Sequence, residues 1–310
     1  MARPEIVPFA DEHLDGAAAL LAERHARHRA AEPTLPEIAD FRRHVDAEWQ
    51  IEGTSGAVAI DGDEVVGYLL GPPGEDFLGP HVWSYVAGQA VRDSELSRDL
   101  YAAAAGRWVE EGLTRHFVFV PAFRDLVDPW LRTSFGISGA LAARETGPER
   151  QPAPEVVVRA STREDTPAAA SFDRVLAQHL REPPSFSFYT LPSEQEYLDE
   201  WRNVHEEEQY TLFVAERDGR TVGHLLLYRR PADNLRVPPD SIDLANAATD
   251  PVLRGSGVGL ALTAHALRWA HEHGYPTMIT DWRMTNLLAS RFWPRRGFRE
   301  TFLRLYRSIP

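Results

Sequence analysis

The stretch DLANAATDPVLRGSGVGLALTAHALRWAHEHG, residues 243–274, decides the fold of this chain. Apolar residues alternate through its start, at Ile242, Leu244 and Ala248, which is typical of a strand. Pro251 ends that strand, because proline has no amide to give to a ladder. Apolar residues then recur at helical spacing, at Leu262, Ala266, Trp269 and Ala270. Gly274 follows where a helix ends. The stretch therefore predicts a strand, a glycine-rich turn and a helix.

The turn itself predicts an anion site. Gly255, Gly257 and Gly259 stand within five residues, and glycine lets backbone amides face outward without side chains in the way. A helix N-terminus adds roughly half a positive charge at the same place. Together these features predict a site for a phosphate or pyrophosphate.

Two common phosphate loops do not fit this turn. A Walker loop ends in Gly-Lys-Ser/Thr, and no lysine is present here. A dinucleotide loop needs G-x-G-x-x-G, and the third position is Leu260 or Leu262, depending on the starting glycine. The pattern that fits is R-x-x-G-x-G, from Arg254 to Gly259. In this pattern the sequence resembles the GNAT superfamily of acyl-CoA-dependent N-acyltransferases.

A second pattern downstream extends the resemblance. The superfamily pattern N-x-x-A-x-x-F-Y-x-x-x-G-F is matched at Asn286, Ala289, Phe292, Gly297 and Phe298. One position departs from it, because Trp293 stands where the family usually has a tyrosine. That tyrosine often protonates the leaving thiolate in the family, so the departure puts the identity of the acid in doubt.

Composition bounds the class of protein. The 310 residues suffice for one large or two ordinary domains, and 43% apolar content can build cores. No apolar run of 18 residues predicts a membrane span, and the N-terminus lacks a signal pattern, so we expect a cytoplasmic protein without membrane partners. The absence of cysteine excludes disulfides and thiolate ligands, and we expect no metal. The net charge of −13 argues against binding to nucleic acid.

The sequence also contains an internal repeat. EIVPFADEHLDGAAALL at 5–21 is similar to VVVRASTREDTPAAASF at 156–172, and AVAIDGDEVVGYLLG at 57–71 to FVAERDGRTVGHLLLY at 213–228. The second pair predicts two hairpins with Asp-Gly turns. We therefore expect two tandem domains, 1–147 and 155–310, joined by a proline-rich polar linker.

Each copy is expected to run strand, helix, helix, hairpin, long strand, helix, strand, helix, strand. The resemblance implies an α+β fold of two tandem GNAT-like units, each with a mostly antiparallel splayed sheet and helices on both faces, as in the mycothiol synthase-like enzymes. In the first copy the loop position reads Val91-Arg92-Asp93-Ser94-Glu95-Leu96, without glycine and with two carboxylates. These carboxylates would repel a pyrophosphate, so we interpret the first copy as a degenerate partner without cofactor.

The resemblance implies that the second copy binds acetyl-CoA, or CoA. The pyrophosphate is expected on the backbone of Arg254, Gly255, Ser256, Gly257, Val258 and Gly259. The pantetheine arm is expected to pair like a strand with Ala247, Ala248 and Thr249, where a backbone amide could also stabilise the thioester oxygen. Asn286 is expected to contact the pantetheine arm, and Arg291 and Arg295 a CoA phosphate.

The implied reaction is transfer of acetyl to a primary amine of a small molecule by direct attack. A base is useful because an amine is mostly protonated at neutral pH. Asp243 and Asp281 are the candidate bases, with a structural hydrogen bond as the alternative for each. Trp293 is a candidate for packing on substrate or cofactor, and Tyr306 for supplying the proton. The stretch REPPSFSFYTLP at 181–192 is interpreted as part substrate wall and part core.

The sequence is compatible with other functions. Trp293 motivates a CoA-binding pseudoenzyme or regulatory module on the same fold. The strand-glycine-helix order followed by Asp281 motivates a dinucleotide enzyme, although its loop spacing fails. Small amines, antibiotics, polyamines and protein amino groups are all possible acceptors. A monomer or a homodimer is compatible with the tandem architecture.

Overall fold

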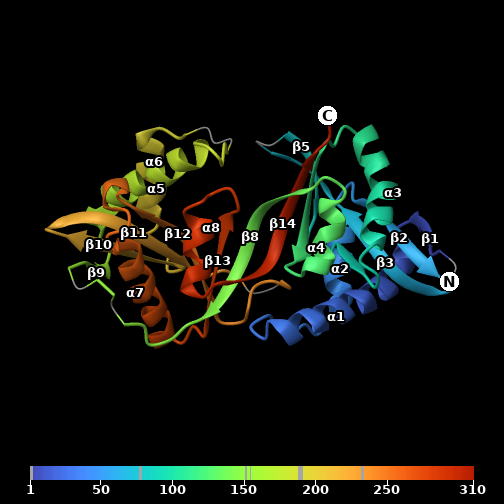
Figure 1. Ribbon diagram of the computed structural model, residues 1–310, viewed down its shortest axis with the longest axis horizontal. Coiled ribbons are helices and arrows are strands. Elements are labelled where there is room, and N and C mark those ends of the chain that lie inside the picture. Colours follow the sequence, from blue (N-terminus) through green and yellow to red (C-terminus); the bar gives the residue numbers. More distant parts are fainter. Residues whose placement is uncertain (1–2, 77–78, 151, 154, 188–190, 232–233) are drawn as a thin grey trace. The chain divides into compact units, whose positions relative to one another are not determined.

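The computed structural model describes residues 3–76, 79–150, 152–153, 155–187, 191–231 and 234–310, which form two compact units (Figure 1). Unit 1 comprises Met1–Leu141, Asp233–Arg236 and Glu300–Pro310. Unit 2 comprises Ala142–Ala232 and Val237–Arg299. Both units combine sheets with helices, so the predicted α+β fold is confirmed.

Unit 2 follows the order expected from the repeat. Its elements are β9 (Val157–Ala160), α5 (Thr166–Arg181), α6 (Glu194–Asn203), β10 (Tyr210–Arg217), β11 (Arg220–Tyr228), β12 (Ser241–Thr249), α7 (Val258–Glu272), β13 (Thr277–Arg283) and α8 (Ala289–Phe292). The sheet order is β13-β12-β11-β10-β9, with the end of β8 (Gly136–Glu145) beside β13. The pairs from β9 to β12 are antiparallel, whereas β12 and β13 are parallel.

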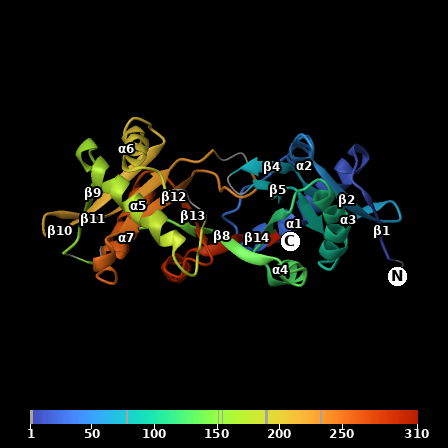
Figure 2. The same cartoon turned by 90° about the horizontal axis from the view of Figure 1, so that it is seen from above.

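Helices cover both faces of the unit 2 sheet. On one face, Leu226 packs in a cluster with Trp201 of α6 and Ala169 of α5. On the other, the ring of Phe213 meets that of Trp269 of α7 edge-on, with 5.7 Å between centroids. Successive side chains of a strand point to opposite faces. Alternate side chains of β10 and β11 therefore pack against α5 and α6 on one face and against α7 on the other. Figure 2 shows these layers from a second direction.

Unit 1 repeats this order with one difference. Its elements are β1 (Glu5–Pro8), α1 (Leu14–Ala31), α2 (Phe41–Trp49), β2 (Ser55–Asp61), β3 (Glu64–Gly71), β4 (Pro73–Asp76), β5 (Gly79–Ser84), β6 (Gln89–Val91), α3 (Leu96–Glu110), β7 (Arg115–Pro121), α4 (Arg124–Leu131), the first part of β8, and β14 (Arg299–Ser308). The long strand expected after the hairpin is broken into β5 and β6, so that expectation was wrong for this copy. The segment 85–88 lies between the two pieces.

The last strand of each copy is placed unexpectedly. β14 comes from the second copy, yet it pairs antiparallel with β7 in unit 1, where Tyr306 lies opposite Phe117. β8 comes from the first copy, yet its residues from Ala142 onward belong to unit 2. The predicted ranges 1–147 and 155–310 describe the sequence repeat, whereas the compact units exchange these ends.

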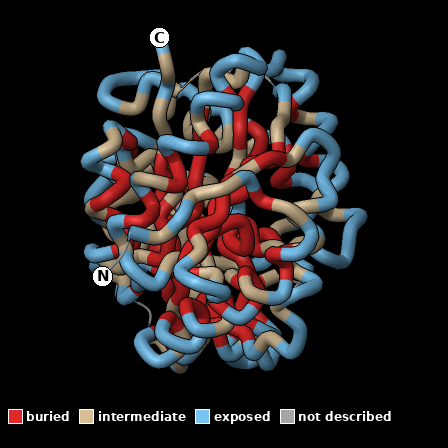
Figure 3. The backbone as a smooth tube through the Cα atoms, turned by 90° about the vertical axis from the view of Figure 1, so that its right-hand side faces the viewer, coloured by how far each residue is buried: buried red, intermediate tan, exposed pale blue. Residues whose placement is uncertain are grey.

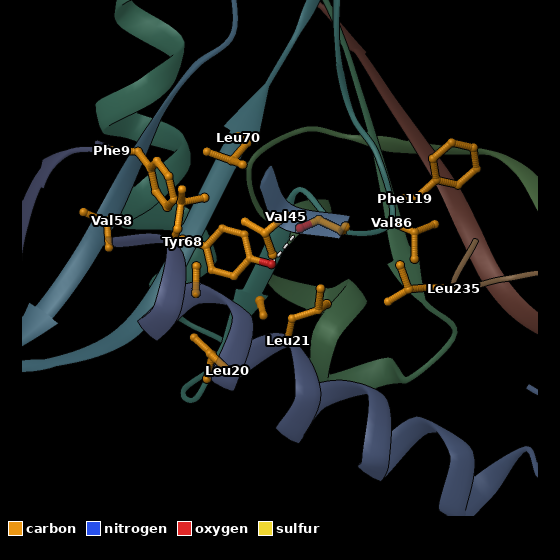
Figure 4. Close-up of a cluster of buried hydrophobic side chains, with 14 of the residues drawn as sticks. Phe9, Leu20, Leu21, Val45, Val58, Tyr68, Leu70, Val86, Phe119 and Leu235 are labelled. Atoms are coloured by element: carbon orange, nitrogen blue, oxygen red, sulfur yellow. Dashed lines mark hydrogen bonds between the residues drawn. The ribbon is translucent and has the colours of Figure 1, made fainter. Parts of the chain in front are cut away.

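The core of unit 1 draws on distant parts of the chain. Fully buried side chains of α1, β2 and β3, such as Leu21, Val58 and Tyr68, pack in one cluster with Leu235 and Phe302 (Figure 4). Leu235 follows β11 in sequence and is 2% exposed. In the tube drawn in Figure 3, buried positions lie towards the inside and exposed positions lie mainly in the outer turns. No helix in the described part of the chain is long and apolar enough to cross a membrane.

Candidate active site

The glycine-rich turn joins β12 to α7 in unit 2. A short 3-10 turn at Pro251–Leu253 comes first, and its start is capped by Asp250, whose carboxylate accepts from the amide of Val252 at 2.9 Å. Gly255 and Gly257 have φ of 82° and 93°. These left-handed values suit glycine, so the sequence RGSGVG builds a turn that other residues would strain. Gly257 is the N-cap of α7.

The N-terminus of α7 provides hydrogen-bond donors. The amide of Ala261 donates to the carbonyl of Gly257 at 2.9 Å and closes the first helical turn. The amides of Val258, Gly259 and Leu260 precede it and have no acceptor within the helix. These amides and the helix dipole are the groups on which the sequence analysis predicts an anion to bind.

The other predicted loop residues differ in exposure. Arg254 is exposed, whereas Val258 is buried and anchors the start of α7. The hydroxyl of Ser256 donates to the carbonyl of Leu253 at 2.7 Å, which holds the turn. A Cβ at Gly257 would come within 3.0 Å of the Cβ of Ala153. The loop is therefore closely packed on that side, and a side chain at Gly257 would have to displace its neighbour.

β12 departs from β13 halfway along its length. The two strands pair only over four residues, from Ser241 opposite Thr277 to Leu244 opposite Thr280. β12 continues to Thr249, paired with β11 alone among the described strands. The far edge of Ala247–Thr249 is thus unoccupied by another described strand, which is the arrangement expected for receiving an extended arm.

A bulge marks the point of departure. Leu226 of β11 lies opposite Asn246, and the next residue, Leu227, lies opposite Leu244. Ala245 is therefore an extra residue in β12. Bulges of this kind end pairing locally and re-aim the side chains around them.

The two candidate bases lie in different surroundings. Asp243 is buried and accepts from Nε of Arg230 at 2.8 Å. Asp281 is exposed, and it shares a face with Asp243 because Ile279, two residues earlier, is the parallel partner of Asp243. Burial lowers the pKa of Arg230, but attraction to Asp243 and Asp281 outweighs it and raises that pKa overall. Both carboxylates thus lie within the field of one guanidinium.

A chain of hydrogen bonds crosses the same face. Nε2 of His224 lies 2.9 Å from Oδ1 of Asn246, and Nδ2 of Asn246 donates to Oδ1 of Asp173 at 2.8 Å. Nε1 of Trp201 donates to Oδ2 of Asp173 at 3.1 Å. His224 is fully buried, and this burial lowers its pKa to about 4. The imidazole is therefore neutral near pH 7.

Two tyrosines and a further carboxylate complete this face. The rings of Tyr210 and Tyr228 stack with 5.2 Å between centroids, and the Arg230 guanidinium lies 5.6 Å from the centre of the Tyr228 ring. Partial burial, followed by the charge of Asp173, raises the pKa of Glu200. The side of the sheet covered by α5 and α6 is therefore acidic and aromatic.

The residues of the second sequence pattern make hydrogen bonds and ring contacts around α8. Oδ1 of Asn286 accepts from the amides of Leu288 and Ala289, at 3.2 Å each, and so caps the start of α8. Trp293 is buried, with the rings of Phe292 and Phe298 at 4.9 and 5.5 Å between centroids. An indole in this position packs against aromatic neighbours and has no acidic hydroxyl.

Several other predicted residues are not brought together. Arg291 and Arg295 are exposed, and neither has an acidic partner among the residues that the structure describes. Tyr306 belongs to unit 1, where its ring packs on Phe117 at 4.8 Å. Of the expected substrate wall, Phe186 is 65% exposed, and 188–190 lie outside the described residues. No group of metal-binding side chains was found in the described ranges.

Unit 1 is built differently at the position of this site. The interruption 85–88 stands where β12 has its bulge. There the guanidinium of Arg24 donates to the carbonyls of Val86, at 2.7 Å, and Gln89. The carboxylate of Glu48 accepts from the amide of Ala87 at 2.7 Å. The side chains of Arg24 and Glu48 thus hold the backbone that is open in unit 2.

Sequence reasoning missed the polar network of unit 2. His224 stands in the apolar run VGHLLLY, and Asn246 in DLANAAT. A lone polar residue in an apolar strand is a usable signal, because a buried polar group needs a partner. Its partner Asp173 could not be identified, since the helix carries several exposed polar residues.

Comparison with known proteins places this geometry in context. Residues 175–298 match the acetyltransferase (GNAT) family. The fold is similar to a GCN5-related N-acetyltransferase from Sphaerobacter thermophilus, at 14% identity and a TM-score of 0.59, covering 99% of this chain and 97% of that one. It is also similar to a GCN5-related glucosamine N-acetyltransferase region of a fungal multi-domain GH3 β-N-acetylglucosaminidase, at 16% identity and a TM-score of 0.56, covering 99% of this chain and 38% of that one. No curated protein matches the sequence.

Proposed function

We propose that unit 2, in which residues 175–298 match the acetyltransferase (GNAT) family, transfers acetyl from acetyl-CoA to a primary amine of a small molecule. One observation carries the proposal. The open edge of β12 and the amides at the start of α7 are joined by only eight residues, 250–257. An extended pantetheine arm and a pyrophosphate need these two features side by side.

The acyl donor is held by backbone groups in this proposal. The amides of Val258, Gly259 and Leu260 receive the pyrophosphate, and Ala247–Thr249 pair with the amide-rich arm. Bound acetyl-CoA supplies the acyl group as an activated thioester. A backbone amide of the open edge stabilises the oxygen as it gains negative charge. Exposed Arg291 and Arg295 are available to a CoA phosphate.

The amine must lose its proton before it attacks. With a pKa of about 10.4, only about 0.04% of a lysine-like amine is neutral at pH 7, equivalent to about 4.6 kcal/mol. Asp281 is the base in our proposal, because it is exposed, whereas Asp243 is buried and neutralised by Arg230. The nitrogen–carbon bond forms as the carbon–sulfur bond breaks, and the amine proton passes to Asp281.

The leaving group makes little demand on an acid. A thiol with a pKa of about 8.5 leaves readily as thiolate. Loss of a general acid costs typically 10²-fold or somewhat more. Trp293 in place of the usual tyrosine is therefore compatible with turnover.

The face beside the open edge favours a cationic acceptor. Asp173, Glu200 and Asp281 contribute carboxylates there, and Tyr210 and Tyr228 contribute aromatic rings. Carboxylates attract an ammonium group, and aromatic faces also bind cations. Anionic acceptors would be repelled. Unit 1, whose corresponding backbone is held by Arg24 and Glu48, acts as a partner without cofactor.

The test begins with ligand stabilisation of the full chain. Acetyl-CoA at 100 times its Kd should add about 2.7 kcal/mol to the free energy of unfolding, whereas NADH and ATP should add none. Gly257→Glu should remove this effect by placing a charge and a side chain in the loop. Gly219→Glu is the matched control, because Gly219 has φ of 73° and open space, in the β10–β11 turn.

A panel of small amines then separates the alternatives. Turnover with a cationic amine supports the transferase. Stabilisation by acetyl-CoA without turnover of any amine favours a CoA-binding module without catalysis. Trp293 motivates this alternative, because it stands where the family usually has a tyrosine. Stabilisation by NADH alone would favour a dinucleotide protein. If acetyl-CoA has no effect at high concentration, the proposed function is wrong.

A further inference from the structure

Asn246 lies where β12 stops pairing with β13. It follows the extra residue Ala245, directly after the last β12 residue that pairs with β13, Leu244. From here β12 has a ladder partner on one side only. A strand segment with one free side and a bulge is held weakly by its backbone, so its position depends on other contacts.

The side chain of Asn246 supplies two such contacts. It is hydrogen-bonded to His224 of β11 at 2.9 Å and to Asp173 of α5 at 2.8 Å. Asp173 is in turn bonded to Trp201 of α6, whose ring stacks on His224 at 4.8 Å. The four side chains come from four elements, so Asn246 connects the bulge to both helices on this face.

The donor and the acceptor in each of these hydrogen bonds follow from the chemistry of Asp173 and His224. The carboxylate of Asp173 only accepts, so Asn246 presents its Nδ2 to Asp173 and its Oδ1 to His224. His224 must then donate from Nε2. Nδ1 of His224 is buried and has no hydrogen-bond partner among the described residues, which agrees with a neutral ring protonated on Nε2 alone. The orientation of Asn246 is therefore fixed by chemistry and not by packing alone.

Unit 1 ties down the same position by other means. Its interrupted segment 85–88 is bonded through Ala87 to Tyr68 of β3, at 2.6 Å, and to Glu48 of α2, at 2.7 Å, and through Val86 to Arg24 of α1, at 2.7 Å. In both units, then, the point where the strand loses its ladder is bonded to the neighbouring strand and linked to both helices, although in unit 2 the link to α6 passes through Asp173. Unit 2 achieves this through a side-chain amide and leaves the backbone beyond it open.

We propose that Asn246 is a positioning residue for acyl transfer, and that its bonds to His224 and Asp173 fix the bulged segment whose open edge holds the thioester. The inference rests on the proposed function of unit 2. It adds a role for a residue that touches neither the pyrophosphate loop nor the candidate base. Loss of the two bonds should leave acetyl-CoA bound at the loop but its carbonyl poorly aligned, and small misalignments are costly for turnover.

The experiment compares Asn246→Leu and Asn246→Asp with the wild type in the full chain. Asn246→Leu keeps the branched shape of the side chain and removes both bonds. We expect kcat to fall by about 10-fold to 100-fold, while the stabilisation by acetyl-CoA and its KM change by less than about threefold. Asn203→Asp, at the exposed end of α6, is the matched control and should behave as wild type.

Asn246→Asp adds a readout that a merely structural role would not change. The new carboxyl would face Asp173, and two adjacent carboxylates share one proton because both cannot ionise cheaply. While protonated, it can still donate to Asp173. The ratio of kcat in this variant to kcat in the wild type should therefore fall as pH rises. Ionisable groups on the same face include His224 on β11, Glu200 on α6, whose pKa responds to Asp173, and Arg230 with Asp243 and Asp281, and the wild type shares all of them.

The outcomes separate the two proposals. Wild-type kcat in folded Asn246→Leu, together with a ratio for Asn246→Asp that does not change with pH, would overturn the positioning role and leave the proposed function intact. A wild type that binds acetyl-CoA but acetylates no amine would overturn the proposed function and the positioning role with it. Thermal unfolding of each variant, measured alongside, reports the folded fraction by which kcat is divided.

Discussion

Arg230 donates to Asp243 at 2.8 Å, and this contact distinguishes two carboxylates that the sequence left equivalent. The Asp243 side chain is 5% exposed, whereas Asp281 is exposed to solvent on the same face. Because Asp243 is buried and paired with Arg230, we expect its main role to be structural. Asp281 is exposed to solvent, so its carboxylate can accept a proton from a bound amine.

Asp281→Asn and Asp243→Asn should fail in different ways. Asp281→Asn should lower kcat by about 10²-fold and leave thermal stability unchanged. Asp243→Asn should destabilise unit 2 by about 1–3 kcal/mol, less than the 3–5 kcal/mol of a fully buried pair, because a third of the Arg230 side chain is exposed. Kinetics and urea denaturation on both variants check this. A stable Asp243→Asn with abolished kcat, beside a fully active Asp281→Asn, would reverse the assignment.

Gly257→Ala should separate backbone strain from ligand binding. At φ of 93° an alanine is strained by about 1 kcal/mol or more, and its Cβ would lie 3.0 Å from Ala153. We expect lower thermal stability and an acetyl-CoA Kd raised by 10-fold or more. Gly274→Ala has similar strain at φ of 79° but open space around its Cβ, so it should lose stability alone. Equal acetyl-CoA Kd values in the two variants would contradict the assignment of acetyl-CoA binding to the loop at Gly257.

Acid should destabilise unit 2 through His224. Burial lowers the pKa of this histidine to about 4 from an ordinary value near 6.5, so the unfolded chain binds a proton more readily than the folded one. Stability is then full above pH 6.5 and declines as pH falls towards 4, by about 3 kcal/mol in total. Urea denaturation at pH 7.5, 6 and 5 measures the decline.

The matched variant for this effect is His224→Gln. A glutamine amide can still donate to Asn246 and does not titrate, so the decline between pH 7.5 and 5 should be smaller by about 2 kcal/mol. His28 of unit 1, whose pKa burial lowers to about 3, contributes equally to both proteins and cancels. Identical pH dependence in the wild type and the variant would contradict the assignment.

Leu235→Ala should destabilise unit 1, although residue 235 stands in the second half of the sequence. Its side chain is 2% exposed and packs with the cluster of Tyr68 and Phe302. Truncating a buried leucine costs about 2–5 kcal/mol. Val252→Ala, at 88% exposure, should stay within about 0.5 kcal/mol. Denaturation curves test this, and a shift of less than 1 kcal/mol for Leu235→Ala would contradict the packing.

The sequence predicted the local elements around the site well. The strand, glycine turn and helix of 243–274 follow from apolar spacing, Pro251 and the glycines, and β12 and α7 confirm them. The hairpins follow from Asp-Gly turns and are present as β2–β3 and β10–β11. Local chemistry decides these features, so local patterns reveal them.

Features that depend on distant partners were not predictable. Nothing in the sequence around Asp243 points to Arg230, 13 positions earlier, and nothing near Asn246 points to Asp173 on α5. The break between β5 and β6 depends on Arg24 and Glu48, two helix residues that look exposed in sequence. Pairing of β14 with β7 also lacks a signal, because an apolar alternating strand fits either copy.

The exchange of final strands has a consequence for biosynthesis. β7 of unit 1 finds its neighbour β14 only after almost all of unit 2 has been translated. Domains commonly fold in order as they leave the ribosome, but here the first must wait, with an open sheet edge, for residues 300–310. Unit 1 therefore cannot be completed before the second copy has been translated, and a protease cut between the two copies would separate β7 from the strand that pairs with it.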